Sequence, residues 1–223
     1  MLCSGSDDKT VKLWDVKKKK FTMTFAGHTN WVRSAQFSID SRMIASGSDD
    51  KTVRLWDVQY EASIHTFSDH TGMVSNVNYH PDGTCLASGG SDKKIKIFDC
   101  RSRRLLQHYD AHDKEVNSVN FHPNGSYLVS SSNDGSIKVW DLRMGHILFT
   151  IFGHEGPTTT ACFSPAGDYI LSGGKDANIC IWASNLSPMP TENLNGTREP
   201  KIPTEVFVTD KERIHKLPDK KLK

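Results

Sequence analysis

The sequence lacks the features that mark membrane, secreted and metal-binding proteins. Among its 223 residues no apolar run approaches the roughly 20 residues that a membrane-spanning helix needs. The start, MLCSGSDDKT, has neither the basic residues nor the apolar stretch of a secretory signal. The five cysteines form no C-x-x-C pair, which argues against a zinc site and a disulfide framework. We therefore expect a cytoplasmic protein with reduced thiols, no membrane association, no metal and no cofactor.

The chain also lacks an excess of charge of either sign. It has 28 Lys and Arg against 26 Asp and Glu, and residues 1–182 hold 20 of each. Because a nucleic-acid surface needs a basic stripe, we expect no nucleic-acid partner. The one basic run, KKKK at 17–20, is expected to be a solvated turn, with an acidic partner as the alternative.

What the sequence does contain is an internal repeat with a period of 42 residues. The repeat is anchored by an aromatic residue, followed by Asp in all but the last copy: Trp14, Trp56, Phe98, Trp140 and Trp182. A serine stands ten residues before each aromatic: Ser4, Ser46, Ser88, Ser130 and Ser172. An aspartate stands six before it: Asp8, Asp50, Asp92, Asp134 and Asp176. A histidine stands 28 before it in every copy except the first: His28, His70, His112 and His154.

Each repeat is predicted to form short strands separated by turns. Runs such as MIASGS (43–48) and TVRLWDV (52–58) have strand length and β-branched or aromatic residues, and HPDG (80–83) and HPNG (122–125) carry turn chemistry. Four antiparallel strands per repeat cannot bury both faces of a sheet, so neighbouring sheets must stack. Radial stacking of units of about 40 to 45 residues is typical of a β-propeller. The sequence thus predicts an all-β fold.

The dipeptides at two positions carry a family resemblance. AGH at 26–28 and LWD at 55–57, with Asp six before Trp, resemble WD-repeat β-propellers, and the resemblance covers residues 1–182. Within that superfamily, segments 28–38, 103–128 and 153–182 are similar to the proteome-of-centriole WD-repeat proteins. The resemblance implies a non-catalytic protein-protein interaction scaffold in centriole and basal-body assembly and ciliogenesis. It also implies centriolar or cytoskeletal protein partners and a place at the centriole, centrosome, basal body and cytoskeleton.

The repeated His, Ser and Asp are the residue types of a serine hydrolase, but a catalytic site is needed once and with an exposed nucleophile. Four copies at identical offsets favour a structural role, and we expect no enzyme. The resemblance implies buried tetrads in which Asp accepts from His, His bonds Ser, and Ser reaches the Trp indole. The predicted tetrads are His28, Ser46, Asp50, Trp56; His70, Ser88, Asp92, Phe98; His112, Ser130, Asp134, Trp140; and His154, Ser172, Asp176, Trp182. Phe98 has no N–H to donate, so its blade should be the least firmly held.

The repeats give an incomplete ring. Residues 1–182 form the propeller segment, with three full blades (31–68, 73–110 and 115–152) and two partial ones, as in an N-terminally truncated form or a fragment of a longer propeller. Open blade edges then predict self-association. Residues 183–223 form a polar, proline-containing basic tail, expected to be largely disordered. Within it TEVFVTD (204–210) either returns as the missing outer strand of the last blade or belongs to the disordered tail.

Partner binding is expected at loop-adjacent residues held by the rigid frame. Trp31, whose counterparts in later repeats are Met73, Glu115 and Pro157, is the first candidate, with packing over a neighbouring blade as the alternative. Arg33, Asp7 and Asp49 are secondary candidates. NDGSIKVWDLR (133–143) resembles the WD-box of substrate receptors for cullin-RING ubiquitin ligases, which would make Arg143 the adaptor contact. That receptor function is the alternative to the scaffold.

Overall fold

The computed structural model describes residues 1–186, 206–210 and 213–216. In this part of the chain every regular element is a β-strand, and the strands form five antiparallel sheets, here called blades 1 to 5. Blade 1 consists of β1 (Leu2–Gly5), β2 (Thr10–Asp15) and β3 (Lys20–Ala26). Blade 2 consists of β4 (Val32–Phe37), β5 (Met43–Ser48), β6 (Val53–Asp57) and β7 (Ala62–Phe67). Blade 3 consists of β8 (Val74–Tyr79), β9 (Cys85–Gly90), β10 (Lys94–Asp99) and β11 (Arg104–Asp110).

Blades 4 and 5 continue the same plan. Blade 4 consists of β12 (Val116–Phe121), β13 (Tyr127–Ser132), β14 (Ser136–Asp141) and β15 (His146–Phe152). Blade 5 consists of β16 (Thr158–Phe163), β17 (Tyr169–Gly174), β18 (Ile179–Ala183), β19 (Val206–Asp210) and β20 (Arg213–Lys216). The expected three full blades are therefore confirmed, and blade 1 is the partial blade that has no inner strand among the described residues.

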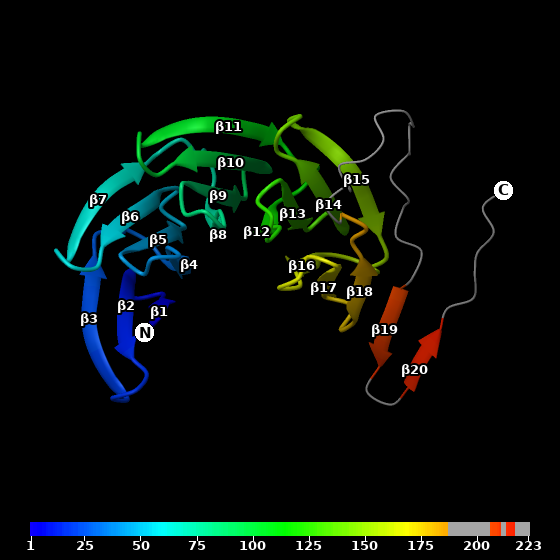
Figure 1. Ribbon diagram of the computed structural model, residues 1–223, viewed down its shortest axis with the longest axis horizontal. Helices are drawn as coiled ribbons and strands as arrows, with labels where there is room; N and C mark the ends of the chain where they lie inside the picture. The colour runs from blue at the N-terminus through cyan, green and yellow to red at the C-terminus, as the bar shows by residue number, and fades with distance from the viewer. Residues whose placement is uncertain (187–205, 211–212, 217–223) are drawn as a thin grey trace, which may run out of the picture.

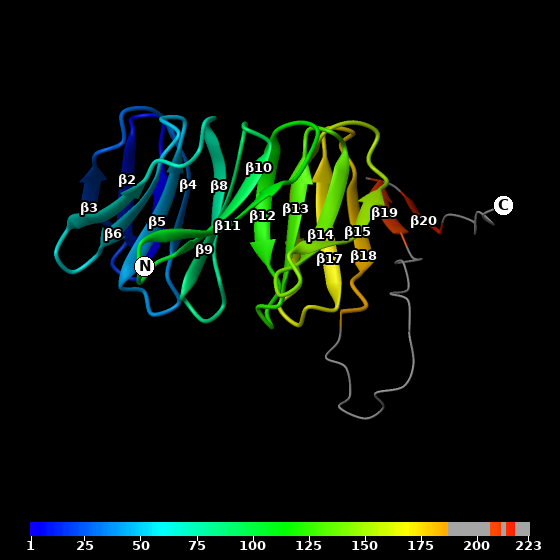
Figure 2. The same ribbon diagram turned by 90° about the horizontal axis from the view of Figure 1, so that it is seen from above.

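The blades are arranged as an open arc. Figure 1 shows β4, β8, β12 and β16 along the inside of the arc and β3, β7, β11 and β15 along its outer rim. Blades 1 and 5 stand at the two ends of the arc with an open gap between them (Figure 1). Seen from above, the strands run across the thickness of the arc, so the turns collect on two opposite faces (Figure 2). This is the all-β, incomplete propeller that the repeat predicts.

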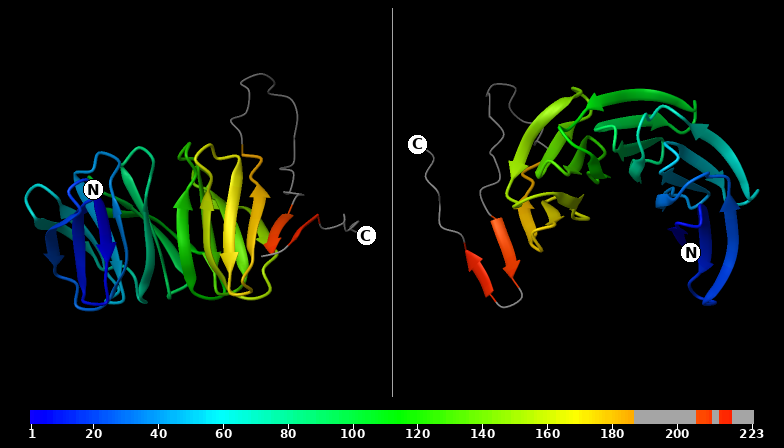
Figure 3. Two further views of the ribbon diagram at one scale, coloured as in Figure 1. Left: turned by 90° about the horizontal axis from the view of Figure 1, so that it is seen from below. Right: turned by 180° about the vertical axis from the view of Figure 1, so that it is seen from behind.

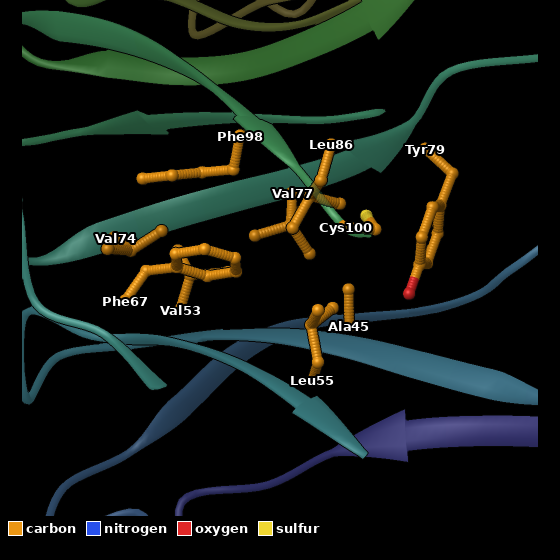
Figure 4. Packing of buried hydrophobic residues seen from close by; sticks show 10 residues of the cluster. All are labelled: Ala45, Val53, Leu55, Phe67, Val74, Val77, Tyr79, Leu86, Phe98 and Cys100. Carbon is orange, nitrogen blue, oxygen red and sulfur yellow. The ribbon is translucent and has the colours of Figure 1, made fainter. Parts of the chain in front are cut away.

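The core lies between successive blades rather than inside any one of them. The cluster between blades 2 and 3 shows the pattern: Val53 and Leu55 of β6 meet Leu86 of β9 and Phe98 of β10, all with no accessible surface (Figure 4). Middle strands are covered on both faces, so β5 is buried from Ile44 to Ser48 without alternation. Because each sheet buries its faces against its two neighbours, an isolated blade would expose most of its apolar side chains.

Polar side chains of the inner strands also join the blades. Gln36 Oε1 accepts a hydrogen bond from the backbone N–H of Tyr79 at 2.9 Å. Asn78 Oδ1 accepts from Phe121 N–H at 3.1 Å, and Asn120 Oδ1 accepts from Phe163 N–H at 3.0 Å. We call these three residues the amide ladder; they stand 42 residues apart and tie each inner strand to the next one.

The tail contributes to blade 5. β19 pairs antiparallel with β18 in the register Cys180↔Val208, Ile181↔Phe207 and Trp182↔Val206, and β20 pairs with β19. Of the two alternatives for residues 204–210, the structure has the returning outer strand, over Val206–Asp210. β19 and β20 thus give this stretch of the tail ladder hydrogen bonds, because its backbone pairs with β18. Residues 187–205, 211–212 and 217–223 lie outside the described residues.

Candidate functional site

The histidine, aspartate and serine of all four tetrads form hydrogen-bonded networks of one geometry. The His Nδ1 atoms of His28, His70, His112 and His154 lie 2.8–3.0 Å from an oxygen of their aspartates. Their Nε2 atoms lie 2.6–2.8 Å from the serine Oγ atoms. In three blades the indole N–H of Trp56, Trp140 or Trp182 donates to that same Oγ at 2.8–2.9 Å. Each network joins a turn, two strands and the aromatic anchor of one blade.

The bonding pattern determines where the protons lie. Because a carboxylate only accepts, the ring Nδ1 carries a hydrogen and donates to Asp, and Nε2 then accepts from the serine hydroxyl. Burial lowers the pKa of His28 and His112 despite the neighbouring carboxylates, so both rings are neutral near pH 7. Burial by itself raises the pKa of Asp50, but hydrogen bonds from Thr52, His28 and the Thr29 N–H outweigh it and hold that pKa at about 2.

The network argues against nucleophilic chemistry at these serines. Ser46, Ser88 and Ser130 have no accessible surface and Ser172 retains 2%. In blades 2, 4 and 5 each Oγ is also occupied, since it accepts from the indole while it bonds the histidine. A substrate carbonyl could not reach these atoms without opening the blade. The network holds the turns against the strands and gives hydrogen-bond partners to the polar groups that the fold buries.

The tetrad of blade 3 differs as its sequence predicts. His70 keeps its bonds to Asp92 and Ser88, at 2.8 and 2.6 Å, but Phe98 donates nothing to Ser88. Phe98 is fully buried and stacks on Phe67 of blade 2, with ring centroids 4.3 Å apart and planes 26° apart. The equivalent ring contacts Phe25–Trp56 and Tyr109–Trp140 occur beside an indole hydrogen bond, so blade 3 keeps the ring contact and lacks the bond. The weaker hold on this blade stays a prediction.

The candidate binding residues near Trp31 gather at one place on the surface. The Arg33 guanidinium lies over the Trp31 ring, 4.7 Å from its centroid, and is held there by Asp49, to which Nε and Nη2 donate at 2.7–3.0 Å. The hydrogen bonds that Arg33 donates to Asp49 raise the pKa of Arg33, and the nearby charge of Asp7 adds to this rise. Trp31 is 44% exposed, so its ring is partly covered and partly accessible to a partner, and the choice between partner binding and packing over a neighbouring blade stays a prediction. We call Trp31, Arg33, Asp49 and Asp7 the Trp31 cluster.

Arg143 lies on the opposite face of the arc. Trp31 precedes β4 and Asp49 follows β5, and because these strands are antiparallel neighbours both residues lie at one end of blade 2. Arg143 follows β14, whose end lies beside the start of β13 and therefore at the other end of blade 4. The side chain of Arg143 is exposed, and its backbone N–H donates to Asp141 at 2.8 Å. The Trp31 cluster and Arg143 therefore belong to separate surfaces.

Three findings bear on other kinds of site. Among residues 1–186 and the two tail strands, no three His, Cys, Asp or Glu side chains gather as metal ligands would. A cavity of about 260 Å³ lies along the inner strands and is lined by ladder residues and their neighbours, including Gln36, Asn78 and Asn120. Those polar atoms already bond the next strand, so this cavity reflects how the blades are joined. In the part of the chain that the structure describes, no helix is long and apolar enough to cross a bilayer.

A comparison with known protein families matches this architecture. The model of the family described as "WD domain, G-beta repeat" matches residues 1–15, 19–57, 61–99, 103–141 and 145–183, which is more than half of the chain. The chain belongs to the WD40-repeat family. WD40 domains are in general protein-interaction scaffolds, typically non-catalytic, whose partners are other proteins. The four longer matches run from the outer strand of one blade through three strands of the next and so cross a blade boundary, whereas the match at 1–15 covers β1 and β2 of blade 1.

Sequence reasoning missed some residues that hold the WD40 arc together. The amide ladder was not predicted, although Gln36, Asn78 and Asn120 occupy one column of the repeat. Two histidines outside the tetrads were missed as well. His80 Nε2 donates to the Gly125 carbonyl at 2.9 Å and His122 Nε2 donates to the Gly167 carbonyl at 3.2 Å. The signal was present in the turns HPDG and HPNG, which were assigned only as turn chemistry.

Proposed function

We propose that this WD40 protein is a non-catalytic scaffold that docks a protein partner on the Trp31 cluster. The observation that carries the proposal is a large indole left 44% exposed while a salt-bridged arginine fixes its position. A preorganised aromatic loses little conformational entropy on binding, which is why exposed Trp and Arg are common at the energetic centres of interfaces. Later blades place Met73, Glu115 and Pro157 at the same position, so the cluster is specific to blade 2.

The cluster has a defined internal support. Asp49 N–H donates to the Trp31 carbonyl at 2.9 Å, which links the turn before β4 to the turn after β5. The carboxylate of Asp49 is mostly buried and faces Arg33 in bidentate geometry. Arg33 therefore serves as a bridge between a buried acid and the exposed ring. A partner that covers Trp31 would meet a surface that is already ordered.

The test compares partner capture by three forms of the full chain. Trp31→Ala should reduce capture of specific protein partners at least tenfold while leaving the melting temperature within about 2 °C, because an exposed ring contributes little to folding. Tyr60→Ala is the matched control: Tyr60 is 76% exposed but lies in the turn between β6 and β7, on the opposite face. Equal partner profiles for wild type and Trp31→Ala would overturn the proposal.

We further propose that the partners are centriolar or cytoskeletal proteins, with a role in centriole and basal-body assembly and ciliogenesis. The support is the resemblance of segments 28–38, 103–128 and 153–182 to proteome-of-centriole WD-repeat proteins. Segment 28–38 contains Trp31 and Arg33, so the resemblance includes part of the proposed docking surface. A fluorescently tagged chain should gather at centrioles or basal bodies, and Trp31→Ala should disperse into the cytoplasm. A wild-type chain spread evenly through the cell would contradict this assignment.

The alternative function, a substrate receptor of a cullin-RING ubiquitin ligase, rests on Arg143. Its side chain is exposed on the face opposite the Trp31 cluster, so an adaptor there and a substrate at Trp31 would not compete. Co-purification of the ligase adaptor with wild type, lost with Arg143→Ala and kept with Trp31→Ala, would favour this alternative. Absence of the adaptor from wild-type preparations would remove it.

A further inference from the structure

A groove of about 670 Å³ lies between blades 2 and 3, both of which have four strands. One wall comes from the β6–β7 turn and the start of β7, and the other from the β8–β9 and β10–β11 turns. The outer strands β7 (cyan) and β11 (green) follow one another along the rim in the view from behind (Figure 3). The groove is as large as typical ligand pockets, which measure about 300 to 1,000 Å³.

The groove and the Trp31 cluster lie at opposite ends of blade 2. Met43 pairs with Asp57 at the end where the groove opens. Trp31 precedes β4, whose first residue, Val32, pairs with Ser48 at the other end of β5. A ligand in the groove therefore does not compete with a partner on the Trp31 cluster.

The floor of the groove is apolar and belongs to the contact between the two blades. Cys100 is 8% exposed and is part of the core cluster that Figure 4 shows, and Ile64 packs against that cluster. Burial raises the pKa of the Cys100 thiol to about 12, so the thiol is neutral near pH 7. Met43 is partly buried and also lines the groove. The floor thus offers an uncharged surface to an apolar side chain.

Two arginines stand on the blade 3 wall without an acidic partner. Arg101 and Arg103 are both exposed, and both line the groove. In the part of the chain that the structure describes, the arginine ion pairs are those of Arg33 and Arg42, and Arg101 and Arg103 form none. Their guanidinium groups are therefore free to donate to an anion that enters the groove.

The two acids that line the groove are committed to their own turns. Asp57 Oδ1 accepts from the N–H groups of Gln59 and Tyr60 at 2.8 and 2.9 Å. Asp82 Oδ1 accepts from the N–H and the hydroxyl of Thr84 at 2.8 and 2.7 Å. Their negative charge remains, so the groove suits a ligand with an anionic group at the arginine wall and not one that is anionic along its whole length.

The arginines are not required by the turn that carries them. The equivalent positions hold Gln59 and Glu61 in blade 2, and Arg143 and Gly145 in blade 4. The backbone at the second position is left-handed, with φ of +54° at Glu61, +60° at Arg103 and +71° at Gly145. Because this conformation favours glycine, the side chain of Arg103 contributes nothing that the turn needs. Among these three turns, only that of blade 3 presents two cations.

We propose that this groove binds an extended segment of a protein partner in which an apolar side chain neighbours an anionic one, a carboxylate or a phosphate. The apolar side chain occupies the floor formed by Met43, Ile64 and Cys100. The oxyanion accepts hydrogen bonds from Arg101 and Arg103. Charge-assisted bonds from arginine to carboxylate or phosphate are stronger than neutral ones, and arginine clusters are a recurring means of recognising acidic and phosphorylated motifs.

The first test selects displayed random peptides of about ten residues on the full wild-type chain, with counter-selection on Arg101→Glu. The enriched peptides should place an apolar residue beside Asp or Glu, and their affinity should weaken as the salt concentration rises. The most enriched peptide is then made with phosphoserine or with glutamine in place of its acidic residue. Tighter binding of the phosphoserine form identifies phosphate as the preferred anion, and equal or weaker binding identifies carboxylate. The glutamine form should lose affinity in either case.

Arg103→Gly is the sharpest variant, because glycine suits the backbone at this position and is the natural residue at Gly145. It should weaken binding of the selected peptide about fivefold, and Arg101→Glu should weaken it about tenfold or more. Lys19→Gly is the matched control, since Lys19 has φ of +51° at the equivalent position of blade 1 and does not line the groove. Lys19→Gly and Trp31→Ala should leave the affinity unchanged. The melting temperature of Arg103→Gly should stay within about 2 °C of wild type.

The second test follows the floor of the groove by NMR in a chain with labelled methionine methyl groups. The Met43 signal should shift when the selected peptide is added. Met144 is the internal control, because it is 73% exposed but lies in the turn between β14 and β15, outside the groove.

Four results would each overturn the proposal. One is a selection that yields no peptides with an acidic residue beside an apolar one. Another is an equal loss of affinity in Arg103→Gly and Lys19→Gly, which would show that only overall charge matters. A glutamine form that binds as tightly as the acidic peptide would exclude recognition of the anion. A Met43 signal that stays in place while the peptide binds would show that the peptide lies elsewhere.

Discussion

At the scale of single residues, the WD40 repeat is a set of polar side chains that the fold buries and satisfies. Each aspartate of the tetrads also accepts from the N–H that follows its histidine, at 3.0–3.1 Å, so one carboxylate holds two turns. Because an unsatisfied buried polar group costs about 1 to 3 kcal/mol, the members of a tetrad depend on one another. For that reason the tetrad residues recur at fixed spacing in the sequence.

Removing an indole donor tests this dependence. Trp140→Phe should lower the free energy of unfolding by about 1 to 2 kcal/mol, because Ser130 loses the bond that the indole donates at 2.9 Å and the smaller ring packs less fully. Urea unfolding measures the change. Trp14→Phe is the matched control. The Trp14 indole donates to Ser4 at 3.0 Å, but Trp14 is 37% exposed, so this variant should lose less free energy of unfolding. Equal losses in the two variants would contradict the role of burial.

The tetrads also predict how stability depends on pH. Burial lowers the pKa of His28 and His112 below the ordinary 6.5, so the unfolded chain takes up these protons first. Their contribution to stability is complete above about pH 6.5 and declines as the pH falls below it. Asp50 and Asp134 have a pKa of about 2 against an ordinary 3.8. The contribution of these two carboxylates to stability is therefore complete above about pH 4 and is lost between about pH 4 and 2.

Urea midpoints at a series of pH values measure both declines. The midpoint should be flat between about pH 8 and 7, fall gradually below about 6.5, and fall again below about 4. In His112→Asn, which cannot take up that proton, the first decline should be shallower. A midpoint that rises as the pH is lowered from 7 to 5 would contradict the buried, neutral histidines.

At the scale of elements, the inner strands are joined by side chains as much as by packing. The amide ladder gives Tyr79, Phe121 and Phe163 a hydrogen-bond partner for the backbone N–H across the blade boundary. His80 and His122 add bonds to turn carbonyls of the next blade. Blade stacking in this arc is therefore directional, and a blade that slid past its neighbour would lose specific bonds along with apolar contact.

Asn120→Val tests the ladder. The change leaves the Phe163 N–H without its acceptor at a blade boundary and should lower the free energy of unfolding by about 1 to 3 kcal/mol. Hydrogen exchange at the Phe163 amide should accelerate with it. Asn120→Asp, which keeps an acceptor oxygen at the same place, should retain most of the protection near pH 7. Unchanged exchange in Asn120→Val would show that the bond contributes little.

At the scale of the whole molecule, the arc is stabilised blade by blade and its last blade depends on the tail. β19 pairs with β18 through Cys180, Ile181 and Trp182, and so covers the outer edge of the strand that carries the last tetrad aromatic. Long-range pairing of this kind was one of two alternatives that the sequence left open. Neighbouring repeats in such an architecture share their stability, so a loss at blade 5 should propagate to blade 4 before the rest.

Deleting residues 204–223 tests the contribution of β19. The melting temperature should fall by several degrees and the amides of β18 should exchange faster, because they lose their ladder partners. Deleting 217–223 alone removes only residues beyond β20 and is the control. Melting and exchange that remain unchanged after the longer deletion would show that β19 does not hold blade 5.

How far sequence reasoning reaches is clear at particular residues. The columns of Ser130, Asp134 and Trp140 were visible in the sequence because their offsets are fixed within each repeat, and the resemblance to WD-repeat propellers implied that they form a buried network. The stacking of Arg33 on Trp31 could not be read from sequence, because it depends on rotamers and on where Asp49 places its carboxylate. The ladder asparagines were missed because their partners lie 43 residues away, in the next blade.

The sequence by itself determined the unit: its length of 42 residues, its strands, its turns and its internal polar network, since all of these arise within one copy of the repeat. Only the tertiary structure decided what happens between units. It determined which side of each strand meets a neighbour, where β19 pairs, and that turns of blades 2 and 3 form the walls of one groove. The physical reason is that burial is a property of what lies opposite a residue, and in a stacked repeat the opposite residue belongs to the next blade.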